Sequence, residues 1–505
     1  MSTQTLPDSP SGRSAAAWVA AAAPVLAVLI GARVALGGTG QILALAVVGA
    51  VVTAALIPTD WIGRLPRYGY LSIEIPMLLL LLSKLVFRVR DAAALVDNPV
   101  DSAGAFRLIC LGGAMFLGLV ACLASTRPGL EVRAHLTSLP FRIYMGYIFV
   151  VLIGAFYSSN FLLTGFRVFD LTAAVVVMAG ACRVAGKQAV PRILGITYWF
   201  AISLMVSAWA GAALMPSAAL ERVAPRLGSY TPLPIRLNGV FPTLASDYLG
   251  LLAALVAVWT LAKLLFPRGD DGGPQPLTLK MVTALSVVTL IMAQYRTGYA
   301  AFATGLMALL WFGRKRWAAV LVALVLLGAF SLAMNDSSKV QAFVLRGQTE
   351  EIVTGLNGRS GWWSAALPVW EESPLVGKGL LTATRYEVLA EIGRTSTATI
   401  HGTWIEALVG TGVAGTALLI VCVLLMLWRS LKAAGRGDVI PIALLAVLLV
   451  RSATGYTFEV FGYPCLLFLV LALKLEDPTV VREEQPSPAR ERHPSPLGRD
   501  FAPVS

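Results

Sequence analysis

Long apolar stretches recur along almost the entire chain, and mostly short polar connections separate them. A run of about 18 or more apolar residues is long enough to cross about 30 Å of hydrocarbon as a helix. The pattern therefore predicts an all-α polytopic membrane protein with about 12–14 transmembrane helices. The predicted spans lie near residues 15–36, 39–57, 71–87, 106–124, 141–157, 168–182, 193–215, 246–265, 279–294, 298–313, 317–334, 404–428, 438–453 and 458–474.

Two connections are much longer than the others. One runs from about 216 to 245, and the second, 335–403, comes before the third-last span. Because long connections commonly carry binding or catalytic sites, we expect 335–403 to be a partly helical external catalytic loop. Residues 475–505 are rich in proline and charge, which predicts a disordered cytoplasmic tail. Residues 1–474 are predicted to form a single transmembrane helical domain.

The distribution of charge predicts the orientation in the membrane. Only 13% of the residues are charged, yet the net charge is +12 and the mean hydropathy is +0.74. Arginine and lysine are concentrated in every second connection, as in 314–316 and 429–436. The positive-inside rule places these connections and both termini in the cytoplasm, with the two long connections outside. Since the positive residues do not gather on a soluble domain, we expect no nucleic-acid partner.

His401 is the candidate for proton transfer. The chain has three histidines, and this orientation places His135 and His493 on the cytoplasmic side. His401, just before an apolar helix, is the one left on the outer side. An imidazole is the side chain best matched to proton transfer near neutral pH. The alternative is that His401 is an ordinary interfacial residue.

Three arginines are expected on the outer side in distinctive surroundings: Arg236 in "RLNGVFP", Arg296 in "AQYRTGYAAFATG" and Arg359 in "NGRSGWW". An arginine near the centre of a membrane helix costs about 2.5–3.5 kcal/mol, and less toward the helix end. Guanidinium groups suit phosphate oxygens, so three that converge would suit a pyrophosphate. For each one, snorkelling to the interface or a local carboxylate partner is an equally good interpretation.

The tryptophans of the second long connection add a second kind of candidate group. Trp362, Trp363 and Trp370 could stack on the apolar faces of sugars, and Trp363 is our candidate for substrate binding. Aromatic rings at the membrane–water interface also anchor proteins at the level of the lipid headgroups, and this is the competing interpretation of the three tryptophans.

Metal and cofactor motifs are not apparent in the sequence. The five cysteines lie in apolar stretches without ligand spacing, and the outer connections contain no paired acidic motif. The chain has no phosphate-binding glycine motif of the nucleotide-binding kinds. We therefore expect no metal and no cofactor. Glu371, Glu372, Glu387 and Glu391 are further candidate bases or metal ligands in the long connection.

The order of these motifs resembles a known family. "YRTG" between two spans, then "GR…WW…P…GKG" in a long outer loop and "H…G.GVAG" opening a span are similar to the O-antigen ligase and O-antigen polymerase superfamily of bacterial envelope glycosyltransferases. The resemblance covers roughly residues 230–425. Two positions differ from the usual pattern: Gly402 follows the histidine in place of Asn, and Tyr295 replaces the frequent Ser before Arg296.

The resemblance implies a GT-C-like, metal-independent enzyme in the bacterial cytoplasmic (inner) membrane. Such an enzyme transfers an undecaprenyl-pyrophosphate-linked glycan to an acceptor hydroxyl on the outer face, with inversion at the anomeric carbon. By analogy, Arg236, Arg296 and Arg359 would hold the donor pyrophosphate, and His401 would be the base on the acceptor, which is a glycan or a lipid-linked molecule. Membrane lipids are the remaining expected partners.

A membrane transporter of an anion or a lipid-linked glycan is the rival interpretation. In a transporter the arginines would form the transport site and His401 a proton relay. Ionisable residues of transporters lie near the bilayer midplane within broken helices. Here they gather at one face, which favours an enzyme.

Overall fold

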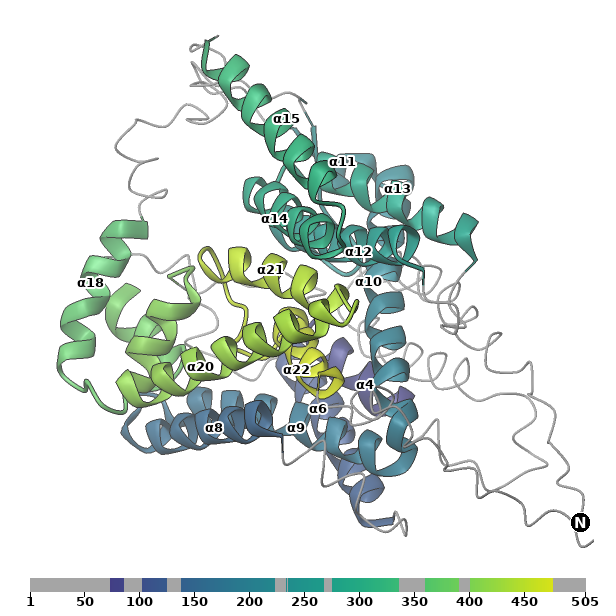
Figure 1. Cartoon of the computed structure of the whole chain (residues 1–505). Helices are drawn as coiled ribbons and strands as arrows, with labels where there is room; N and C mark the ends of the chain where they lie inside the picture. The colour runs from purple at the N-terminus through teal and green to yellow at the C-terminus, as the bar shows by residue number, and fades with distance from the viewer. Residues whose placement is uncertain are drawn as a thin grey trace, which may run out of the picture.

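A computed structural model gives the fold of the chain (Figure 1). It describes residues 73–85, 102–124, 138–222, 233, 235–267, 275–335, 359–389 and 400–475. The predicted spans 15–36 and 39–57, the candidate Glu391 and the tail after 475 lie outside these residues. Their predicted roles therefore remain predictions.

The described part of the chain is a bundle of α-helices, which confirms the predicted fold class. Among the described residues, seven helices are long and apolar enough to cross a membrane: α6 (Ser102–Ala124), α8 (Leu139–Tyr157), α9 (Phe161–Ala185), α10 (Ala189–Leu214), α12 (Ser246–Leu265), α13 (Pro276–Ala293) and α20 (Thr403–Gly435). The other helices of the bundle are α4 (Glu74–Leu82), α14 (Arg296–Phe312), α15 (Arg316–Asn335), α21 (Ile440–Ser452) and α22 (Tyr463–Lys474).

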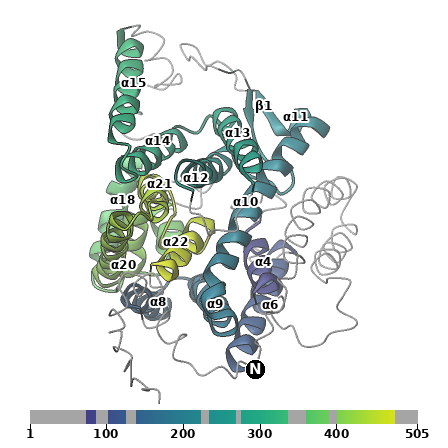
Figure 2. The same ribbon diagram turned by 45° about the vertical axis from the view of Figure 1, so that its right-hand side comes forward.

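Helix α12 lies in the interior, packed against α10, α13, α14 and α21 (Figure 2). Small residues allow close helix approach at several crossings. A Cβ on Gly305 of α14 would lie 2.6 Å from the side chain of Val447 in α21, and one on Gly180 of α9 would lie 2.6 Å from the Gly118 carbonyl of α6. Such contacts replace the hydrophobic driving force that is missing between helices in lipid.

Helix α20 is broken at Gly412, whose φ of 62° and ψ of −167° are not helical. Residues 374–379 of the loop 335–403 fill the break. Val413 N and Ala414 N donate to the carbonyls of Pro374 and Leu375 at 2.8 and 3.1 Å. The carbonyls of Val409 and Gly410 accept from Lys378 N and Gly379 N, each at 3.0 Å. These bonds satisfy the backbone groups that the break frees, as burial requires.

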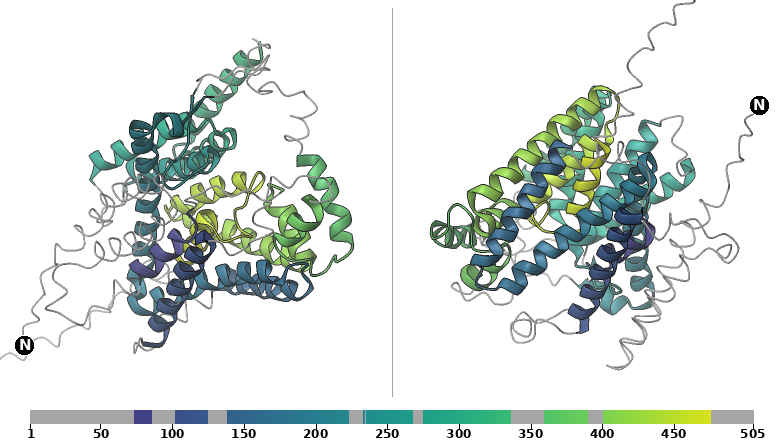
Figure 3. Two further views of the ribbon diagram at one scale, coloured as in Figure 1. Left: turned by 180° about the vertical axis from the view of Figure 1, so that it is seen from behind. Right: turned by 90° about the horizontal axis from the view of Figure 1, so that it is seen from below.

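Helix α8 runs antiparallel beside α20 (Figure 3, right). Gly146 faces Leu418, and Gly154 faces the Gly410 carbonyl next to the break. The buried hydroxyls of Tyr144 and Tyr147 in α8 donate to the carbonyls of Phe458 and Glu459 at 2.8 and 3.0 Å. Helix α8 thereby anchors the connection between α21 and α22.

The two long connections contain ordered elements. After α10, a short helix α11 (Pro216–Ala219) leads into the antiparallel hairpin of β1 (Leu220–Arg222) and β2 (Ile235–Leu237). The sequence pattern did not predict this hairpin, because each strand has only three residues. The loop 335–403 carries α18 (Arg359–Glu371) and one π-helical turn, η3 (Thr384–Val388), which confirms that it is partly helical.

Candidate active site

His401 lies at the start of α20 in a left-handed backbone conformation, with a φ of 52°. Few residues other than glycine adopt this region, although histidine is enriched in it. Its neighbours fix it from the side of α18: Trp363 Nε1 donates to the carbonyl of buried Ile400 at 3.3 Å, and the ring of Trp362 lies 5.9 Å from the imidazole. Strained backbone held by its surroundings is common at functional sites.

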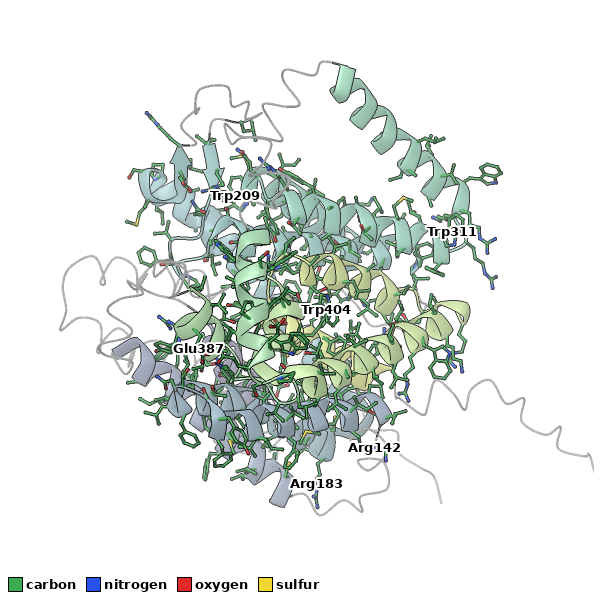
Figure 4. The ribbon with its side chains drawn as sticks, turned by 90° about the vertical axis from the view of Figure 1, so that its left-hand side faces the viewer. Arg142, Arg183, Trp209, Trp311, Glu387 and Trp404 are labelled. Atoms are coloured by element: carbon green, nitrogen blue, oxygen red, sulfur yellow. The ribbon has the colours of Figure 1, made fainter. Side chains whose placement is uncertain are left out.

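Arg359 is the first residue of α18. Trp362 follows three residues later, about one helical turn, so the first turn of α18 runs beside the His401 ring. In Figure 4 the side of the molecule that carries α18 at the left of Figure 1 faces the viewer. The inner face of α18, with Ala366 and Val369, packs in one apolar cluster with Ile400 and Val409. This cluster holds the start of α18 against the start of α20.

Arg296 is the first residue of α14. Gln294, with a left-handed φ of 49°, closes α13 and reverses the chain. Its side chain donates to the carbonyls of Leu233 and Ile235 at 2.9 and 2.6 Å, which ties the turn to the hairpin. Tyr295 fits between two glycines, because a Cβ on Gly250 or Gly298 would lie 2.8 or 2.7 Å from it.

Residues 453–457, between α21 and α22, connect the two predicted halves of the site. Thr403 Oγ1 donates to the Gly455 carbonyl at 2.8 Å at the start of α20. Thr454 Oγ1 lies 3.4 Å from the hydroxyl of Tyr295, next to Arg296. The structure therefore brings His401, Trp362, Trp363 and the start of α18 together and joins them to the start of α14 through this segment.

Arg236, the third predicted arginine, has a local carboxylate partner. Its Nε and Nη2 atoms donate to Glu221 Oε2 at 3.2 and 2.5 Å across the hairpin. This contact, with help from Asn238, lowers the pKa of Glu221. Strand β2 adjoins Gln294, so Arg236 lies on the same side of the bundle as Arg296, with its guanidinium engaged by Glu221.

Two carboxylates of the loop 335–403 pair with one lysine of the same loop. Lys378 Nζ contacts the carboxylates of Glu372 and, at 2.7 Å, Glu387. Partial burial opposes the charge on Lys378, but the two carboxylates prevail and raise its pKa. Among the residues with described positions, no three His, Cys, Asp or Glu side chains come together in a way that could hold a metal ion.

The sequence analysis missed three buried ionisable residues near this site: Arg451, Glu406 and Glu459. Glu406, in the first turn of α20, accepts from Thr384 Oγ1 at 2.6 Å, which links the π-helical turn to α20. Glu459 accepts from the backbone N–H of Thr457 and Phe458 at 3.1 and 3.0 Å. Burial raises the pKa of Glu459. In the sequence, each of the three is simply a charged residue within or beside a predicted span. Ordinary interfacial residues have the same pattern, so the sequence could not single these three out.

The arrangement offers a positioned imidazole beside aromatic rings and a nearby helix start that carries a guanidinium. These groups suit proton abstraction from a hydroxyl next to an anionic leaving group.

Residues 281–420 match the family model described as O-antigen ligase. No curated protein matches the chain significantly. The matched segment contains Arg296, Arg359 and His401 together with the break in α20, whereas Arg236 and Arg451 lie outside it. The match confirms, over residues 281–420, the resemblance drawn from the sequence.

Proposed function

We propose that this multi-pass membrane protein transfers a glycan from a polyprenyl-pyrophosphate donor to an acceptor hydroxyl on the outer face of a bacterial cytoplasmic membrane. The observation that carries the proposal is the setting of His401. Its left-handed backbone and its contacts with α18 hold an imidazole at the end of the bundle where Arg296 and Arg359 each begin a helix. The family match supports glycan transfer of the O-antigen ligase type.

In the proposed reaction, the neutral imidazole of His401 accepts the proton of the acceptor hydroxyl. The acceptor oxygen forms a bond to the anomeric carbon of the donor glycan as the bond from that carbon to the phosphate oxygen breaks. The displacement is a single step, so the anomeric configuration inverts. The polyprenyl pyrophosphate leaves as an anion and needs no proton.

The arginines act on the leaving group. Negative charge grows on the bridging phosphate oxygen in the transition state, and fixed guanidinium groups stabilise it. Arg296 and Arg359 supply these guanidinium groups in our proposal. Arg236 can join them only if it exchanges its contact with Glu221 for the donor. The proposed reaction uses no metal ion, and Trp363 lines the glycan side of the site.

One observation favours the alternative function, transport: α20 is broken, as helices at transporter binding sites often are. In transporters the freed backbone groups at such a break coordinate the cargo. Here residues 374–379 of the same chain occupy them. The break is therefore an attachment point for the external loop, and we favour transfer.

The direct test is incubation of the purified protein with a polyprenyl-pyrophosphate oligosaccharide, alone and with a separate glycan or lipid-linked acceptor. Chain growth in the first mixture would identify a polymerase, and attachment to the added acceptor a ligase. A parallel reaction with EDTA should proceed at the same rate. Absence of any product in all mixtures would contradict the proposal.

A further inference from the structure

Arg451, the penultimate residue of α21, is a buried cation with incomplete pairing. The residue is only 8% exposed. Its guanidinium contacts the hydroxyl of Tyr295 and lies 5.6 Å from the centre of that ring. Its Nε atom is buried without a hydrogen-bond partner among the residues that the structure describes. A buried charged group left short of partners is costly, so its presence requires an explanation.

The space for this guanidinium is built into the backbone beside it. A Cβ on Gly455 would lie 2.4 Å from Cζ of Arg451, so the glycine makes room for the side chain. Tyr295, in turn, fits because Gly250 and Gly298 lack side chains. Tyr295, the residue before α14, thus contacts the Arg451 guanidinium through its hydroxyl.

The start of α14 is itself suited to an anion. The helix runs from Arg296 to Phe312, and its N-cap residue, Tyr295, makes no side-chain capping hydrogen bond. The first N–H groups of a helix point outward and carry partial positive charge, which favours a phosphate. The incompletely paired Arg451 lies against the N-cap residue, so two independent features point to the same anion.

Asp247 is the counter-ion of Arg451, but the pairing is loose. The Arg451 Nη2 to Asp247 Oδ2 distance is 3.9 Å, which is too long for a hydrogen bond. The Asp247 side chain is 45% exposed and belongs to the first turn of α12. It can therefore turn toward water when a stronger anion approaches.

We propose that Arg451 and the N-terminus of α14 form a subsite for a phosphate group of the lipid-linked donor, and that Asp247 is the counter-ion that this phosphate displaces. The inference rests on the proposed function and adds a fourth guanidinium to it. Arg451 lies outside the segment that matches the family model. Tyr295 acts as a positioning residue, because its hydroxyl holds the guanidinium beside the helix start.

The experiment measures equilibrium binding of undecaprenyl pyrophosphate to the full chain in lipid nanodiscs, with the Arg451→Gln, Arg451→Lys and Asp247→Asn variants. Separate arms use inorganic pyrophosphate and added phosphatidylglycerol, to distinguish the donor headgroup from a free phosphate or a bulk lipid. Arg167→Gln is the matched control, because the Nε of Arg167 is likewise buried without a hydrogen-bond partner among the described residues. Its Nη1 pairs with Asp170 at 3.2 Å, closer than Arg451 pairs with Asp247.

We expect Arg451→Gln to weaken donor binding by roughly 10- to 100-fold, as for the loss of a hydrogen bond to a charged group. Arg451→Lys should bind the donor more tightly than Arg451→Gln but less tightly than the native protein. Lysine restores the positive charge but lacks the planar pair of N–H donors of a guanidinium group. Asp247→Asn should tighten binding, because it removes the competing anion, whereas a merely structural ion pair would give weaker binding. Thermal unfolding of each variant in detergent establishes that it is folded.

Unchanged affinity in folded Arg451→Gln, or an equal loss in Arg167→Gln, would overturn the inference. Weaker binding in Asp247→Asn would do the same. If Arg296→Ala still lowered affinity in that case, the proposed transfer function would stand without Arg451. If the native protein bound no polyprenyl pyrophosphate at all, the proposed function itself would fail.

Discussion

Replacement of Gly412 by alanine tests how the loop 335–403 is attached to the helical bundle. Gly412 has a φ of 62°, and a Cβ built on it would lie 2.3 Å from the carbonyl carbon and 2.4 Å from the oxygen of Leu375. These are backbone atoms and cannot rotate away. Alanine must therefore push residues 374–379 out of the break in α20.

The expected cost has two parts. A positive φ with an extended ψ, a region essentially restricted to glycine, costs another residue about 1–3 kcal/mol. Displacement of the loop also lengthens the bonds from Val413 N and Ala414 N, 2.8 and 3.1 Å in the native protein. Each such bond contributes about 0.5–1.5 kcal/mol. The sum is a loss of about 2–6 kcal/mol in the free energy of unfolding, or an equal cost of detaching the loop.

The assay compares thermal unfolding and limited proteolysis of the external loop in detergent-purified Gly412→Ala and Gly435→Ala. Gly435 is the matched control, because it ends the same helix and a Cβ there would meet no described atom within 4 Å. We expect Gly435→Ala to change stability by less than about 1 kcal/mol. Equal stability and equal loop protection in the two variants would refute the account of the break.

Two further predictions concern charged groups at the site. In equilibrium binding, Arg296→Ala and Arg359→Ala should each weaken donor binding by roughly 10- to 100-fold. Arg296→Lys should restore only part of the lost affinity. Native affinity in both alanine variants would show that neither arginine belongs to the pyrophosphate site. Burial raises the pKa of Glu459 above its ordinary value of 4.5. The stability that protonated Glu459 contributes is therefore complete below about pH 4.5 and is lost as the pH rises through the raised pKa. Glu459→Gln should therefore unfold with a weaker dependence on pH above about 4.5, and a thermal-unfolding series with the native pH dependence would contradict this.

The helical architecture was predictable because it depends on a repeated property of the chain. Apolar runs long enough to span predicted the boundaries of α8, α12, α13 and α14 to within a few residues. The two strands, of three residues each, are too short to show periodicity, and the pairing of Glu221 with Arg236 that accompanies them was left open.

Within the site, the sequence context singled out His401, Arg296 and Arg359 as candidates, and the structure places Arg296 and Arg359 at the first residues of α14 and α18. Arg451 and Glu406 were not assigned roles, because their importance depends on burial against distant segments. The glycines of "PLVGKGL" and "GTGVAG" could be noticed in the sequence. Their purpose, the joining of a loop to a broken helix, depends on pairing that no local pattern reveals.

The central claim is that His401 removes the acceptor proton. The most direct measurement is the rate of glycan transfer by purified His401→Asn, alongside its affinity for the polyprenyl-pyrophosphate donor. Asparagine tolerates the left-handed backbone at this position but cannot act as the base. The account predicts transfer slower by about 10²–10⁴-fold with donor affinity unchanged. A transfer rate within a few-fold of the native protein would contradict it.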